Sequence, residues 1–241
     1  MEDKKLEEQE INVKKGKFIK WLDNYWYHYK WPTIIVAFFV VVFAVSFIQS
    51  ATKKEKDILI TYAGSVALTA DEKAAIETLL SDNLPEGFGN KGADGDAGLT
   101  AYLIYSAAQI KEQESKQIFV DTAFNSSEYS TLNSQYKTGN GSIYLLEKWL
   151  YDELVPKNEG DVERLKPLSE IFGETPSGAV DKYGIRLGDT EIYKNSPALQ
   201  VLPADTMICL HEQILGQKKY DKEIEAFKAI AKLAVNDDNE E

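Results

Sequence analysis

Apolar and polar positions separate sharply near the start of the chain. Residues 31–52 carry no charged side chain, and between Ile34 and Ile48 only Ser46 interrupts the apolar run. A helix of this length covers about 30 Å, the thickness of the hydrocarbon layer, where only a helix satisfies its own backbone polar groups. The pattern predicts one transmembrane helix at 31–52, in contact with membrane lipid. Pro32 would lie in its first turn, where a missing N–H costs nothing.

The residues that flank this segment predict its orientation. Aromatic side chains, which favour the headgroup layer, are concentrated before it: Trp21, Tyr25, Trp26, Tyr27, Tyr29 and Trp31. Five lysines precede it within twenty residues, and three follow it. This excess predicts that residues 1–30 are cytoplasmic and interfacial and that the chain from 53 onward is extracytoplasmic.

A cleaved signal peptide is the main alternative for this segment. It fits less well, because thirty polar and aromatic residues precede the apolar run and Val45 to Ala51 contains no small-x-small cleavage pattern. We therefore expect a signal anchor that stays in the cell membrane as a single pass.

Beyond the span, strand and helix patterns alternate. Asp57–Gly64 reads as a strand, and Thr69 with Glu72 forms a capping box at the start of a helix that Pro85 ends. Glycines make Gly87–Gly98 a loop. The next expected elements are strands at Ala101–Tyr105 and Gln117–Val120 around a polar connection, a helix capped by Asn125–Ser127 and closed by Gly139, a buried strand at Ser142–Leu146 and a short helix at Glu147–Val155.

The last third of the chain predicts shorter elements. Leu165–Phe172 suits a helical turn, and a final amphipathic helix carries Ile224, Phe227, Ala231 and Ala234 on one face. Two strand pairs are expected: Tyr183–Leu187 with Glu191–Tyr193 around a Gly-Asp turn, and Leu199–Leu202 with Met207–Leu210. The sum is a mixed α/β or α+β domain at 53–235, followed by an acidic tail at 236–241.

Composition narrows the classes of function. The chain has 241 residues and a formal net charge of -12, and the part from residue 53 onward holds 20 basic and 33 acidic residues. Such acidity argues against nucleic acid as a partner, because phosphate binding needs clustered Lys and Arg. The single Cys209 cannot form an internal disulfide, and its alternating apolar neighbours indicate a small buried side chain.

One stretch of the domain resembles a known family. The run from Tyr136 to Leu146 (YKTGNGSIYLL), followed by Leu165-Lys-Pro-Leu168, is similar to a segment of the extracellular solute-binding proteins of bacterial ABC importers, and Asn24–Trp31 before a single span is similar to membrane-anchored proteins of clostridia-like Gram-positive bacteria. The resemblance implies a solute-binding-like domain. The chain is shorter than the two-lobed members and lacks a lipid-bearing cysteine near its start, so it implies either reduced lobes or the same fold without transport.

Six residues are candidates for ligand binding. Five are polar and fall at expected loop ends beside strands, where α/β folds place ligand groups and where helix N-termini offer N–H donors: Asn125, Ser126, Ser127, Asn140 and Ser142. Each also suits an ordinary capping or turn role. The sixth, Trp149, is the one tryptophan beyond the membrane-proximal region and could stack on a sugar or pack in the core.

The sequence offers little catalytic chemistry. His28 and His211 are the two histidines; His28 lies in the aromatic stretch, no nucleophile elbow accompanies His211, and we read His211 as a surface residue at a strand end. Asn90–Gly98 superficially resembles a calcium loop but has Ala101 where the closing Glu is needed. We expect no catalytic residues, no metal and no cofactor.

These observations leave three hypotheses. The first is a non-catalytic, membrane-anchored extracytoplasmic module that binds a small solute or a peptide. The second is a structural or assembly subunit whose partner is another membrane protein. The third is an envelope hydrolase that depends on His211.

Overall fold

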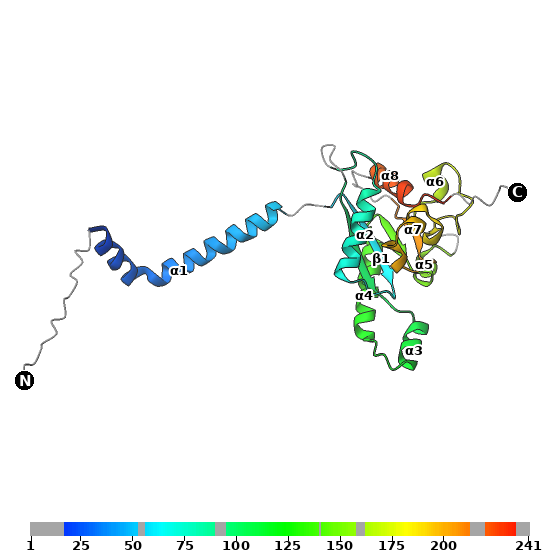
Figure 1. Cartoon of the computed structure of the whole chain (residues 1–241). Coiled ribbons are helices and arrows are strands. Elements are labelled where there is room, and N and C mark those ends of the chain that lie inside the picture. The colour runs from blue at the N-terminus through cyan, green and yellow to red at the C-terminus, as the bar shows by residue number, and fades with distance from the viewer. Residues whose placement is uncertain are drawn as a thin grey trace, which may run out of the picture. The chain divides into compact units, whose positions relative to one another are not determined.

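The computed structural model describes residues 17–52, 56–89, 95–139, 141–157, 162–212 and 220–234. The chain divides between Glu55 and Lys56 into two units, which are considered separately (Figure 1). The calcium-like loop falls mostly on residues 90–94, outside the described residues, as do the acidic tail and Asn140.

The first unit contains one long helix, α1 (Lys17–Thr52). Its segment Asn24–Ile48 is long and apolar enough to cross a membrane. The predicted helix start is wrong: α1 begins before the aromatic stretch, so Pro32 lies inside the helix and cannot donate a hydrogen bond to the carbonyl of His28. Figure 1 shows that α1 is bent, as an internal proline favours.

Three residues of the aromatic stretch, Trp21, Tyr25 and Tyr29, lie along one side of α1. The rings of Trp21 and Tyr25 are stacked with centroids 5.7 Å apart, and those of Tyr25 and Tyr29 with centroids 5.3 Å apart. Residues four positions apart share a helix face, so these three rings form a continuous stripe.

The second unit is built on a five-stranded mixed sheet. Its strands are β1 (Ile58–Gly64), β2 (Ala97–Leu103), β3 (Ile143–Leu146), β4 (Ile185–Arg186) and β5 (Met207–Leu210), in the order β2-β1-β3-β5-β4. β1 is parallel to both β2 and β3, whereas β5 is antiparallel to β3 and β4. The expected mixed α/β class is confirmed.

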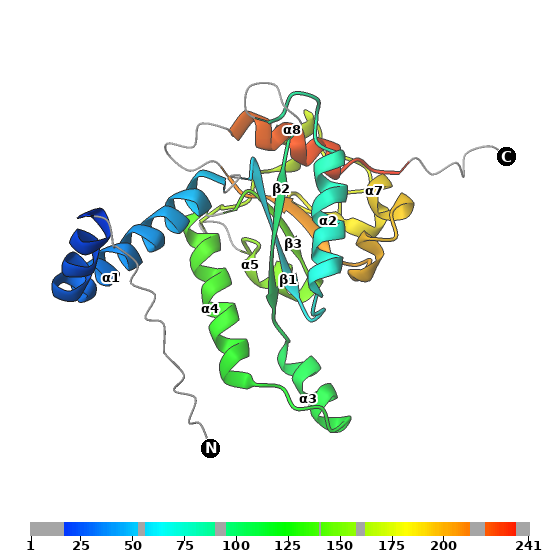
Figure 2. The same ribbon diagram turned by 60° about the vertical axis from the view of Figure 1, so that its left-hand side comes forward.

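Helices cover both faces of this sheet. α2 (Ala70–Asp82) and α8 (Tyr220–Ile230) pack on one face, where Ile76, Leu80 and Phe227 are buried. α4 (Thr122–Thr138) and α5 (Lys148–Leu154) pack on the other, with Leu132 and Tyr136 buried. Figure 2 shows α2 and α4 on opposite sides of β2. With apolar layers on both faces, the central strands are nearly continuous apolar runs.

Several local predictions are confirmed. Thr69 and Glu72 form the expected capping box at α2, Gly139 closes α4 in the left-handed conformation with φ 64°, and α6 (Leu168–Phe172) is the expected short helix. β1, β3, β5 and α5 lie where the pattern placed them. α8 contains the expected Ile224 and Phe227 but ends at Ile230, before Ala231 and Ala234. Cys209 is fully buried, as predicted.

Two predicted strands before β3 need correction. β2 begins at Ala97, inside the expected glycine loop, and the chain at 117–120 is not a strand. The polar connection is instead the helix α3 (Ala107–Ser115), because Ser106 and Gln109 form a second capping box that satisfies its first turn. Gln117 then leaves the helix in a left-handed conformation, with φ 60°.

The two predicted hairpins are also wrong. Residues 191–193 belong to the helix α7 (Glu191–Asn195), whose first turn is capped by the Thr190 hydroxyl, and the Gly-Asp turn lies in a 3₁₀ turn, η2 (Leu187–Asp189). Leu199–Val201 is a second 3₁₀ turn, η3. In the structure β4 pairs with β5. The prediction failed because a short apolar run does not indicate which strand it pairs with.

The prediction that His211 lies on the surface is wrong. It is 4% exposed, and its ring nitrogens Nδ1 and Nε2 lie 2.7 Å from the Glu212 carbonyl oxygen and 2.8 Å from the Tyr136 carbonyl oxygen. Because both nitrogens face backbone carbonyls inside the core, this imidazole has no free nitrogen to act as a general base.

Candidate functional site

The candidate site lies at the carboxyl ends of the parallel strands. From β1 the chain runs to β2 on one side, and from β2 it returns to β3 on the other side of β1. The connections that leave β1 and β3 therefore diverge, and ligands of open α/β sheets bind at such a point. Ser65 follows β1 directly, and Glu147 follows β3.

Glu147 holds this end of the sheet together. Its Oε1 accepts hydrogen bonds from the Ser65 backbone N–H at 2.6 Å and from the Ser65 hydroxyl at 2.5 Å. Its Oε2 accepts from Gln109 Nε2 at 3.0 Å and from Trp149 Nε1 at 3.1 Å. The side chain of Glu147, which is 5% exposed as a residue, is thus satisfied by four donors and ties α3 and α5 to the end of β1.

A glycine makes this arrangement possible. A Cβ on Gly64 would lie 2.6 Å from Cγ of Glu147 and 2.6 Å from the Tyr62 hydroxyl oxygen. Both distances are shorter than a van der Waals contact, so a side chain at residue 64 would displace Glu147 and Tyr62, and glycine avoids this clash. The need for glycine here comes from close approach and not from a turn.

Two adjoining hollows meet at Trp149. One, of about 400 Å³, is lined by Ser65, Gln109, Glu147, Lys148, Trp149, Asp152, Pro203 and Asp205. The other, of about 420 Å³, is lined by residues that include Tyr105, Asn125, Ser126, Tyr129, Trp149 and Glu153. We call the pair the Trp149 crevice. Its walls combine aromatic rings with carboxylates, a composition that suits a polar ligand with an apolar or cationic part.

Charges and hydroxyls inside the crevice are partly paired. Lys148 forms an ion pair with Asp152, and the Tyr129 hydroxyl donates to Glu153 Oε2 at 3.1 Å. Burial, together with the hydrogen bond to Glu153, raises the pKa of the Tyr129 phenol. Tyr129 is therefore a neutral donor and not an anion near neutral pH.

Three of the predicted ligand residues line the crevice. Asn125, Ser126 and Trp149 meet there, although not for the predicted reason. α4 begins at Thr122, where Asp121 accepts hydrogen bonds from the N–H groups of Ala123 and Phe124, so Asn125–Ser127 lie within the helix and offer no free N–H donors.

The other predicted ligand residues lie elsewhere or are not described. Ser127 is exposed on α4 and does not line either hollow. Ser142 is buried before β3, at the opposite end of that strand from Trp149, where its carbonyl accepts the His211 N–H at 2.7 Å. Asn140 lies outside the described residues.

Sequence reasoning missed Ser65, Gln109 and Glu147. A signal for two of them was present, because Ser65 and Glu147 each follow a strand that the apolar pattern located correctly. Gln109 was hidden within a connection expected to lack a helix. Among the described residues, no group of three or more His, Cys, Asp or Glu side chains is placed to hold a metal ion.

A scan against protein-family models and searches of curated proteins and of solved structures found no match to this chain.

Proposed function

We propose that this protein is a non-catalytic binding module held at the cell membrane by α1. Residues 1–30 would lie on the cytoplasmic side and the domain that starts at about residue 53 outside it. The Trp149 crevice would take a small solute or a peptide. The observation that supports this proposal is the meeting of two hollows at Trp149, at the divergence of the β1 and β3 connections.

The chemistry of the crevice favours a ligand class. Glu153 and Asp205 bring carboxylates to walls that also present the rings of Trp149 and Tyr129, whereas Asp152 is already paired with Lys148. A ligand with an ammonium or guanidinium group beside an apolar part would use both. Because both oxygens of the Glu147 carboxylate already accept hydrogen bonds, Glu147 would position Trp149 and would not itself bind the ligand.

Intrinsic fluorescence tests the proposal directly. In the full-length protein in nanodiscs, replacement of Trp21, Trp26 and Trp31 by Phe leaves Trp149 as the single tryptophan. We expect saturable changes in its emission on titration with arginine, lysine or short basic peptides, and weaker changes with glucose. Flat responses to this panel, with the thermal unfolding midpoint also unchanged, would contradict ligand binding at the crevice.

The proposed orientation has its own test. A tag at the C-terminus should be cleaved by protease added outside intact cells, and the protein should sediment with membranes. A protected tag would contradict an extracytoplasmic domain, whatever the result of the fluorescence titration.

A second candidate function is an assembly subunit of a membrane protein complex. The observation that favours it is a set of exposed apolar side chains in the connection from α3 to α4 and in the first turn of α4: Ile118, Phe119 and Phe124, of which Phe119 is 89% exposed. Crosslinking in intact cells tests this second function, because an assembly subunit should give a stable protein partner, whereas the Trp149 titration tests solute binding.

A further inference from the structure

The outer edge of β2 presents its backbone in alternation. In the parallel register with β1, the N–H of Ile104 donates to the Gly64 carbonyl at 2.8 Å, so Gly98, Thr100 and Tyr102 also direct their N–H groups toward β1. Ala97, Leu99, Ala101 and Leu103 therefore direct both N–H and C=O away from the sheet. β2 is the edge strand on this side.

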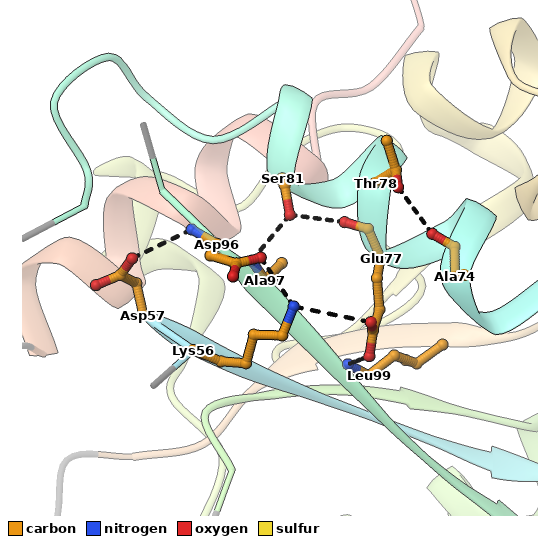
Figure 3. Close-up of polar contacts among 9 residues, drawn as sticks. All are labelled: Lys56, Asp57, Ala74, Glu77, Thr78, Ser81, Asp96, Ala97 and Leu99. Carbon is orange, nitrogen blue, oxygen red and sulfur yellow. Dashed lines mark hydrogen bonds and ion pairs between the residues drawn. The ribbon is translucent and has the colours of Figure 1, made fainter. Parts of the chain in front are cut away.

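Side chains close the two ends of this edge. Ser81 Oγ accepts the N–H of Ala97 at 2.9 Å, and Glu77 Oε1 accepts the N–H of Leu99 at 2.8 Å, both from α2 (Figure 3). Just beyond β2, Asn125 Oδ1 accepts the N–H of Tyr105 at 2.7 Å, and Asn125 Nδ2 donates to the Tyr105 carbonyl at 3.1 Å.

The middle of the edge is left open. Among the described residues, none places an acceptor on the N–H of Ala101 or Leu103. The spacing of α2 gives a reason, because four helix residues rise about 6 Å, which matches two strand residues. The series that begins with Ser81 at Ala97 and Glu77 at Leu99 would therefore continue with Lys73 at Ala101. Lys73 has no acceptor and cannot continue the series. We call Ala101–Leu103 the open window.

An apolar pocket adjoins the open window. It has a volume of about 270 Å³ and is lined by Leu103, Tyr105, Ile118, Phe119, Val120, Asp121, Phe124 and Asn125. Phe119 is 89% exposed, and Ile118 and Phe124 are about half exposed. Exposed rings grouped beside unpaired strand backbone are costly to leave in water and mark a contact surface.

The charge around the window selects the kind of partner. Glu77, whose Oε2 also lies 3.8 Å from Lys56 Nζ, is at one end of the window, and Asp121 lines the pocket at the other, so the lysines of this edge only partly offset its carboxylates. Glu128 lies close enough to Tyr102 to contribute, after burial, to the raised pKa of that phenol. The chain from residue 53 onward carries 33 acidic against 20 basic residues. A second copy of the domain would therefore bring like charges together, whereas a basic segment would be attracted.

We propose that the open window binds an extended segment of another protein, with alternating apolar side chains and a basic flank, as an added strand. Ala101 and Leu103 would each exchange N–H···O bonds with one residue of an antiparallel segment, and one apolar side chain of that segment would fill the pocket beside Phe119. This surface shares Tyr105 and Asn125 with the wall of the Trp149 crevice, but it does not use the hydrogen bonds of Glu147 and does not depend on a solute binding in the crevice.

Fluorescence polarisation with designed peptides tests the proposal. The probe is the labelled peptide KTVTFTVK, added to the full-length protein in nanodiscs. Two matched peptides serve as controls: the same sequence N-methylated at alternate residues on the pairing edge, and ETVTFTVE. We expect KTVTFTVK to bind at least about tenfold more tightly than either, because one control lacks pairing donors and the other has repelled flanks.

Two variants of the protein locate the site. Lys73→Glu should place a carboxylate on the N–H of Ala101 and close the window, so that the peptide binds at least about fivefold more weakly although the edge has become more acidic. Lys73→Met, which adds no acceptor and removes a positive charge, should not weaken binding. Phe119→Ser should weaken binding without unfolding the domain, because this ring is exposed.

Other results would overturn the proposal. Equal binding of the N-methylated peptide, or no binding of KTVTFTVK at millimolar concentration, excludes strand addition. Tighter binding to Lys73→Glu would show simple charge attraction. A dimer of the full-length chain that Lys73→Glu dissociates would assign the window to a second copy. None of these results affects the Trp149 fluorescence test, so the two proposals fail separately.

Discussion

The side-chain amide of Asn125 in α4 forms hydrogen bonds with both backbone polar groups of Tyr105. It thereby occupies the place of one residue of a neighbouring strand and ends the open window at Leu103.

Asn125→Ala should destabilise the domain by about 1–3 kcal/mol, because two partly buried backbone groups lose their partner. The matched control is Ser126→Ala, one residue further along α4, whose hydroxyl donates to the local Thr122 carbonyl. That change should cost less than about 0.5 kcal/mol. Urea unfolding followed by Trp149 fluorescence compares the two; equal losses would show that the Tyr105 bonds contribute nothing.

Replacement of Glu147 should have a larger effect. Glu147→Ala leaves four donors around a buried space, from Ser65, Gln109 and Trp149, and should cost about 3 kcal/mol or more. Glu147→Gln keeps one acceptor oxygen but turns an NH₂ group toward donors, so its loss should be intermediate. The same urea experiment measures both. A loss below about 1 kcal/mol for Glu147→Ala would mean that water replaces the carboxylate without penalty.

The capping box of α2 predicts a pH dependence. Hydrogen bonds from the Thr69 backbone N–H and then from its hydroxyl lower the pKa of Glu72 below its ordinary value of 4.5. Since the folded pKa is depressed, Glu72 stabilises the fold above the ordinary value, and this contribution is lost as the pH falls through the folded pKa.

Glu72→Gln separates this contribution from other acidic groups. Glutamine can still accept the Thr69 N–H, so the variant should be nearly as stable as the wild type at neutral pH but should lose less stability on acidification. Unfolding midpoints across the acid range measure the difference. Parallel pH profiles for the two proteins would be the contrary outcome.

Burial raises the pKa of the Cys209 thiol, whose side chain lies in β5 under α4 and α5. The thiolate is the reactive form, so the native protein should not react with a disulfide reagent at about pH 8. In concentrated guanidinium chloride the single cysteine should react fully. Rapid reaction of the native protein would show that β5 opens without global unfolding.

The sequence predicted those elements whose signals are local. A continuous apolar run located β1 and β3, the Thr69 and Glu72 pair located the start of α2, and Gly139 located the end of α4. The start of α4 was missed because Thr, Asn and Ser are common in loops, whereas here packing of Leu132 and Tyr136 against the sheet stabilises the helix.

Features that depend on pairing across the chain were not predictable in this way. Nothing local to Ile185 indicates that it pairs with Ile208, and nothing local to Ala101 indicates that one side of its strand stays open. The crevice was found in part, since Trp149 was singled out for its chemistry, but Glu147 was read only as a helix start.

β1 is the first strand of the domain to leave the ribosome, yet in the folded sheet it lies between β2 and β3. It can pair with β2 once Leu103 has been made, but its other edge has no partner until synthesis reaches Ile143. A nascent chain would hold an apolar strand with one bare edge through that interval, so a chaperone that shields extended apolar segments would have its longest opportunity to act there.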